Sequence, residues 1–130
     1  LEVYASATAI VRMTREAAPR YPDSSLLSKE LTSQVVFSAG QEGDGLALEV
    51  FRRMGVYLGI GIGNLINILN PEMIVIAGGV MNGWELFEKS MSHEVADRAF
   101  PLLAASVKIV RAECGDDAGL LGAARLAFDN

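Results

Sequence analysis

The chain has 130 residues, 51% hydrophobic and 21% charged, so it is long and apolar enough to bury the core of one domain, expected over residues 1–130. Its net charge of −5 argues against nucleic acid as a partner, because phosphate binding needs clustered Lys and Arg. Cys114 is the only cysteine, which excludes an internal disulfide and indicates an inert thiol in a reducing, cytoplasmic setting. The most apolar stretch, residues 55–69, is too short and too polar to span a membrane.

Two helices are predicted in the first third of the chain. Helical spacing of apolar residues predicts a helix over 1–18, which two prolines end. A polar, turn-prone segment follows it. A second helix is expected from a cap at Thr32 or Ser33 to Ala39, with Gly40 ending it.

The longest predicted helix covers residues 45–69 and begins after Asp44, a good N-cap residue. Within it, Gly55, Gly59 and Gly63 recur every four residues and lie on one face. Because glycine costs about 1 kcal/mol in a helix interior, this stripe indicates that another backbone packs very close. The string GIGIGN in this helix does not indicate a dinucleotide site, since its spacing is G-x-G-x-G and no strand precedes it.

A β-α-β unit is predicted next. Residues 73–77 form a short apolar run that is typical of a parallel strand buried on both faces. Asn82 and Glu85 resemble a capping box for a helix that ends near Arg98. The inner face of that helix is expected to hold Leu86, Phe87, Met91, Val95 and Ala99.

Pro101 is expected to break the chain before a second strand over 107–112. A last helix follows, capped by Asp116 or Asp117, and its small, close-packing residues are Gly119, Gly122 and Ala123. The order is therefore α-α-α-β-α-β-α, with a right-handed, parallel crossover between the strands. Two parallel strands make a poor sheet alone, and the chain begins without Met, so we expect it to be part of a larger protein.

Few side chains suggest catalysis. His93 is the only histidine, and without a second ligand near it in the sequence a solvent-facing or structural role is expected. Asp116 and Asp117 are interpreted as a helix cap, not a catalytic pair. Trp84 is expected to pack against other side chains.

Gly78 and Gly79 lie between the first predicted strand and the helix that follows it. Ligands of open α/β sheets sit beyond the carboxyl ends of strands, and a following helix start offers free N–H groups. Glycine also lets a ligand lie flat on the backbone. A plain tight turn explains the same pair equally well, so the residues alone leave both readings open.

Three stretches together resemble the ROK family of bacterial sugar kinases and repressors: LEVYASATAIVRMTREA, GIGIGNLINILNPEMIVIAGGV and GDDAGLLGAARLA. The resemblance covers essentially the whole chain and is most specific in the run from Asn64 to Gly79. The opening stretch is similar to the glucokinase branch in particular.

The resemblance implies an α/β fold, the C-terminal lobe of an actin-like ATPase with ribonuclease-H-like lobes. This chain would be a mostly helical fragment with one parallel β-α-β unit. The parent protein would transfer phosphate from ATP, with Mg²⁺, to a hexose, giving glucose 6-phosphate from glucose. It would be a cytoplasmic homodimer, and the isolated fragment would be inactive.

The resemblance also implies which site residues this chain holds. Glu2 matches the family's sugar-binding Glu, since a carboxylate accepts hydrogen bonds from neighbouring hydroxyls. Gly78, Gly79 and Val80 match the turn against which the nucleotide rests, and Asn82 is expected to line the same cleft. The general-base Asp, the zinc ligands and the rest of the sugar site would lie upstream, so no catalytic residue and no metal ligand is expected here.

Two other interpretations stay open. A ROK repressor would carry a DNA-binding helix-turn-helix upstream, whereas a kinase would carry an early Asp-Gly-Gly phosphate loop. The third interpretation is a dimerisation or packing module, in which Gly55, Gly59 and Gly63 mediate helix contacts.

Overall fold

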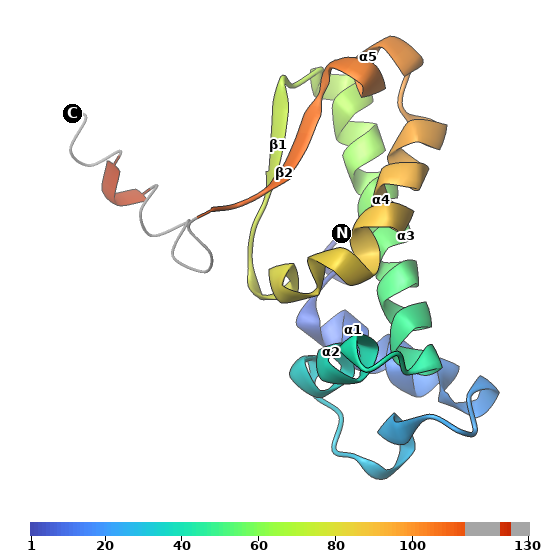
Figure 1. Ribbon diagram of the computed structural model, residues 1–130. Coiled ribbons are helices and arrows are strands. Elements are labelled where there is room, and N and C mark those ends of the chain that lie inside the picture. The colour runs from blue at the N-terminus through green and yellow to red at the C-terminus, as the bar shows by residue number, and fades with distance from the viewer. Residues whose placement is uncertain (114–122, 126–130) are drawn as a thin grey trace.

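The computed structural model describes residues 1–113 and 123–125, and its elements pack around one long helix, α3 (Figure 1). The α-helices are α1 (Ala7–Ala17), α2 (Ser33–Gln41), α3 (Gly45–Leu69), α4 (Trp84–Arg98) and α5 (Pro101–Ser106). Short 3-10 helices lie at Ala18–Arg20 (η1), Ser25–Ser28 (η2) and Gly79–Gly83 (η3), and the strands are β1 (Met73–Ile76) and β2 (Lys108–Arg111). Helices α1, α2, α4 and α5 all contact α3.

The helix predicted over 45–69 is confirmed residue for residue as α3. Asp44 caps it, accepting hydrogen bonds from the N–H groups of Leu46 at 3.0 Å and Ala47 at 3.2 Å. Asn70 ends it in the left-handed conformation, with φ 44° and ψ 55°, which Asn adopts more readily than most residues. Pro71 follows and cannot continue the helix.

The glycine stripe of α3 lies against α4 of the same chain. A Cβ at Gly55 would approach the Phe87 carbonyl oxygen to 2.6 Å, and one at Gly59 would approach the Met91 carbonyl oxygen to 2.6 Å. Such distances leave no room for a side chain, so the predicted close approach of a second backbone is confirmed. Because α4 of the same chain occupies the stripe, the part of the third interpretation in which the glycines mediate helix packing holds, and the part in which they mediate dimerisation is corrected.

Side-chain hydrogen bonds from α3 hold the C-terminal end of α4. The side-chain amide of Asn67 on α3 donates to the Arg98 carbonyl at 3.0 Å and accepts from the Phe100 N–H at 2.9 Å. These bonds satisfy backbone groups where α4 ends. The predicted inner face of α4 is confirmed for Phe87, Met91, Val95 and Ala99, which are all buried, whereas Leu86 is half-buried.

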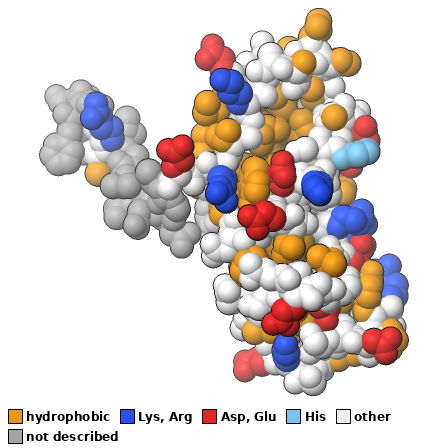
Figure 2. Space-filling model, in the orientation of Figure 1, with side chains coloured by type: hydrophobic (Ala, Val, Ile, Leu, Met, Phe, Trp, Pro, Cys, Tyr) orange, Lys and Arg blue, Asp and Glu red, His pale blue; other side chains and the backbone are white. Residues whose placement is uncertain are grey.

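Strands β1 and β2 pair in parallel, with Met73 opposite Lys108 and Ile76 opposite Arg111. The crossover between them contains η3, α4 and α5, as Figure 1 shows. The expectation of a strand buried on both faces is wrong for this chain: Met73 is 51% and Val75 56% exposed. The helices of the described chain cover one face of the sheet, and Figure 2 shows hydrophobic side chains exposed in this part of the molecule.

Several predicted element boundaries are wrong. The first helix begins at Ala7, not at the first residue, because Ser6 caps it by accepting from the Ala9 N–H at 3.2 Å. Asn82 and Glu85 form no capping box: Asn82 lies inside η3, and α4 starts after Gly83 without a side-chain cap. Pro101 opens α5 instead of simply breaking the chain, since a first-turn residue needs no backbone N–H.

Gly40, expected to end the second helix, lies inside α2, which continues to Gln41. Of the two predicted cap residues, Thr32 and not Ser33 caps α2, accepting from the Val35 N–H at 3.2 Å. The last helix predicted from Asp116 or Asp117 and its Gly119 and Gly122 lie outside the described residues, as does Cys114; residues 123–125 are helical. Among the described helices, none combines the length and apolarity that crossing a membrane requires.

We predict that Gly59→Ala destabilises the protein by about 1–3 kcal/mol, because the new methyl group meets backbone that cannot move aside. Gly61→Ala on the same helix is the matched control. Its methyl group would meet only the flexible end of Leu1, 2.9 Å away, and gains helix propensity. Urea unfolding of both variants checks this, and equal midpoints would contradict the packing argument.

A second prediction concerns Asp44, which also accepts hydrogen bonds from Ser24 Oγ at 2.9 Å and Ser25 N–H at 2.8 Å. Partial burial raises the pKa of Asp44, but these hydrogen bonds and that from Ala47 outweigh it and hold the pKa below the ordinary value of 3.8. The ionised form therefore stabilises the fold above pH 3.8, and this stabilisation disappears as the pH falls through the lower, folded-state pKa.

Asp44→Asn, a neutral isostere, should therefore lower stability by roughly 1 kcal/mol at neutral pH. The gap between the two proteins should close below the folded-state pKa of Asp44. Urea unfolding at a series of pH values measures the gap, and a gap independent of pH would contradict the assigned role of the carboxylate.

Candidate functional site

The turn after β1 needs a glycine at Gly78. This residue has φ 99° and ψ 174°, a backbone conformation that side chains make costly. Its carbonyl accepts from the Met81 N–H at 3.0 Å, which starts the η3 turn. Gly78 is therefore explained by the backbone alone.

Gly79 has no such explanation. Its φ is not positive, and a Cβ built on it would meet no atom within 4 Å. The protein could therefore hold a methyl group here without clash. The tight turn therefore requires glycine at Gly78. It does not require glycine at Gly79, where a Cβ would meet no other atom.

Gly79 and Asn82 face a small recess together with residues from three other helices. Its lining is Ala7 and Ile10 of α1, Ser33, Gln34 and Phe37 of α2, Phe51 of α3, and Gly79, Asn82 and Gly83 of the η3 turn. The recess holds only about 20 Å³, room for one water molecule, so it is too small to enclose a nucleotide. The backbone of Val80 belongs to η3, while its side chain lies outside the described part of the structure.

Glu2 lies at a different hollow, of about 300 Å³, which Val3, Ser6, Thr8, Ala9 and Arg12 also line. Its side chain is exposed, and it makes no hydrogen bond or ion pair with the described residues. The first turn of α1 borders both hollows, with Ala7 at the Gly79 recess and Thr8 at the Glu2 hollow. The structure therefore places the predicted sugar and nucleotide residues on two sides of one helix start.

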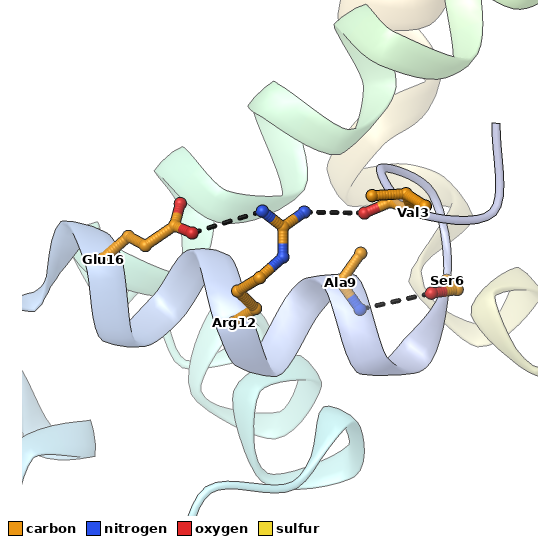
Figure 3. A network of polar contacts seen from close by, with 5 residues as sticks. All are labelled: Val3, Ser6, Ala9, Arg12 and Glu16. Carbon is orange, nitrogen blue, oxygen red and sulfur yellow. Dashed lines mark hydrogen bonds and ion pairs between the residues drawn. The ribbon is translucent and has the colours of Figure 1, made fainter.

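Arg12 is a residue of this region that the sequence pattern did not indicate. Its guanidinium donates to the Val3 carbonyl through Nη2 at 2.6 Å and pairs with Glu16 through Nη1 at 3.2 Å (Figure 3). The Tyr4 ring centroid lies 5.8 Å from its guanidinium carbon. Only the Arg12–Glu16 spacing of four residues was visible in the sequence, because the Val3 contact depends on how the preceding segment folds back.

Two of the other candidates, His93 and Trp84, behave as structural residues. His93 is solvent-facing, as expected, with Nδ1 3.2 Å from Asp97 Oδ2. Trp84 packs edge-on against Phe87, with ring centroids 5.6 Å apart. Asp116 and Asp117 lie outside the described residues, and within the described ranges no three His, Cys, Asp or Glu side chains gather as a metal site.

Comparison with known proteins gives one consistent family. The family model described as the ROK family matches residues 1–130. A glucokinase of Halalkalibacterium halodurans is 38% identical over 127 residues, covering 94% of this chain and 38% of the relative. A xylose repressor of Bacillus subtilis is 26% identical over 131 residues, covering 99% of this chain and 31% of the relative. The chain thus spans less than half the length of these relatives.

Solved structures agree with the sequence comparison. A ROK family glucokinase from Streptomyces griseus, in complex with glucose and AMPPNP, superposes with a TM-score of 0.77 at 26% identity. The likeness covers 99% of this chain and 44% of that one. The expected fold class is confirmed: an actin-like ATPase fold, mostly helical here, with a small parallel two-stranded sheet.

The two glycines of the turn should respond differently to substitution. We predict that Gly78→Ala lowers stability by about 1–3 kcal/mol, because alanine is strained at φ 99°. Gly79→Ala should leave stability unchanged or slightly raised, since its methyl group enters open space. Thermal or urea unfolding of the two variants measures this difference. Equal losses at both positions would mean that the turn itself requires both glycines.

Proposed function

The chain belongs to the ROK family, and we propose that residues 1–130 form the C-terminal, nucleotide-binding lobe of an ATP-dependent hexose kinase. In this proposal the longer protein transfers the γ-phosphoryl group of ATP to a sugar hydroxyl, with glucose as substrate and glucose 6-phosphate as product. The glucokinase relatives support both the reaction and the sugar. Catalysis would consist mainly of positioning and charge stabilisation.

The open space at Gly79 carries the nucleotide part of the proposal. A glycine that the protein's own packing does not require fits a surface on which a flat ligand lies directly against the backbone. The turn also lies beyond the carboxyl end of a parallel strand, where α/β proteins bind nucleotides. We assign the adenosine contact to Gly78, Gly79 and Val80, with Asn82 beside them.

The exposed carboxylate of Glu2 carries the sugar part. It lies at the rim of a hollow and is not engaged by the described residues, so both oxygens are available to accept hydrogen bonds from sugar hydroxyls. One carboxylate cannot enclose a sugar. The remaining contacts and the general-base Asp are assigned to the lobe upstream of this chain.

When bound, Mg²⁺ would neutralise charge on the ATP phosphates. We assign no ligand for it, or for a structural zinc ion, to the described residues, because no three His, Cys, Asp or Glu side chains gather among them. The proposal also includes a cytoplasmic homodimer, with no membrane and no nucleic acid partner. On its own the 130-residue chain should show no kinase activity, since it carries only part of each binding site.

A sugar-responsive repressor is the second candidate, and the xylose repressor relatives favour it. Both candidates need a sugar contact such as Glu2, but only the kinase needs ATP. Nucleotide binding therefore separates the two more sharply than sugar binding does.

We predict that Gly79→Val in the full-length protein weakens ATP binding by about tenfold or more, because the branched side chain occupies the surface on which the nucleotide lies. Glucose affinity should stay within about twofold of the parent protein. Calorimetric titration with ATP and with glucose measures both constants, and a coupled assay with several hexoses establishes the substrate.

Glu2→Gln is the reciprocal control, expected to weaken glucose binding and leave ATP binding intact. Unchanged ATP affinity in Gly79→Val would remove Gly79 from the site. A full-length protein that binds sugar and DNA but not ATP would favour the repressor.

A further inference from the structure

The segment that carries Glu2 is not helical, yet its neighbours are held in place on both sides. Leu1 packs on α3 at Gly61, where a Cβ would come within 2.9 Å of it. The Tyr4 ring lies on the Tyr57 ring of α3, with centroids 4.7 Å apart, and the Tyr4 N–H donates to the Leu1 carbonyl at 2.9 Å. Glu2 thus projects from a short, anchored turn although its own side chain is unengaged.

Arg12 supplies the polar anchor of this turn. Its Nη2 bond to the Val3 carbonyl is short, at 2.6 Å, and is charge-assisted, which makes it one of the stronger kinds of hydrogen bond. The Tyr4 ring lies close to the same guanidinium. Figure 3 shows the guanidinium between the Val3 carbonyl on one side and the Glu16 carboxylate on the other.

The ion pair between Arg12 and Glu16 matters for geometry more than for stability. Both side chains are close to half exposed, at 44% and 48%, and such surface pairs contribute little to folding. In the structure the guanidinium nevertheless lies along α1, with Nη1 at the Glu16 carboxylate. That direction places its second nitrogen on the carbonyl of the residue next to Glu2.

We propose that Arg12 is a positioning residue, which fixes the backbone at Val3 and thereby holds the Glu2 carboxylate in the orientation that meets the sugar. The inference rests on the proposed role of Glu2 as a sugar contact. Arg12 acts here through Glu2, so its removal should affect sugar binding and leave nucleotide binding alone.

The anchoring itself can be measured without any ligand, by hydrogen–deuterium exchange of the full-length protein. Arg12→Ala should speed exchange of the Tyr4 amide by roughly tenfold, while amides in the middle of α1 keep their rates. Arg52→Ala is the matched control, because Arg52 also pairs with a carboxylate on its own helix, at 2.7 Å from Glu49, but touches no part of this turn. Unchanged exchange in Arg12→Ala would overturn the inference whatever the protein's activity.

The functional consequence is measured by sugar and ATP titrations of the same variants. Arg12→Ala should weaken sugar binding by about three- to tenfold with ATP affinity unchanged, and Arg12→Lys, which keeps a donor and the charge, should recover part of the loss. In a Glu2→Gln background, Arg12→Ala should add little, because the group that it positions is already lost.

The outcomes separate the two claims. If Glu2→Gln weakens sugar binding and Arg12→Ala does not, the positioning role is overturned and the sugar contact stands. A full additional loss in the double variant would mean that Arg12 contacts the sugar itself, which also overturns the inference. If Glu2→Gln leaves sugar binding unchanged, the proposed function of Glu2 fails, and the positioning role fails with it even where exchange shows an anchored turn.

Discussion

The close approach of α3 and α4 is the constraint on which the rest of the structure depends. Glycines on α3 let the α4 backbone come so near that even a methyl group at Gly59 would lie 2.6 Å from a carbonyl oxygen. Helix α4 lies in the crossover between the two strands. Its distance from α3 therefore also sets where β1, β2 and the η3 turn lie. Each interior glycine lowers helix stability by about 1 kcal/mol relative to alanine. The close packing of α4 that the glycines allow offsets this loss.

The candidate site follows from that arrangement. The η3 turn leads directly into α4. Because α4 packs so close to α3, Gly79 and Asn82 of this turn lie beside the starts of α1 and α2. On the other side of the α1 start, an anchored turn presents Glu2. Neither hollow alone encloses a ligand, and the chain spans less than half of its relatives. This geometry fits a lobe that contributes one wall of a cleft.

Much of the fold could be predicted because its signals are local. Asp44 begins α3 and Thr32 begins α2 as expected, since a cap acts within its own turn. The capping box at Asn82 fails for the opposite reason: η3 takes the chain through Gly83 before α4 starts, and nothing in the side-chain pattern marks a 3-10 turn. Pro101 alone does not distinguish a break from a helix start, because proline both ends and starts helices and only the packing of the following residues decides which.

By itself, the sequence determined the bounds of α3, the parallel crossover and the close packing of the glycine stripe, because these depend on spacing along the chain, and its motifs carried the resemblance to the family. Only the tertiary structure decided which glycine of the turn the backbone requires: Gly78 by its φ, and not Gly79, which faces open space. It alone also showed Arg12 on the Val3 carbonyl. Such facts depend on what surrounds a residue in space, and residue spacing carries no information about empty space or about a carbonyl nine positions away.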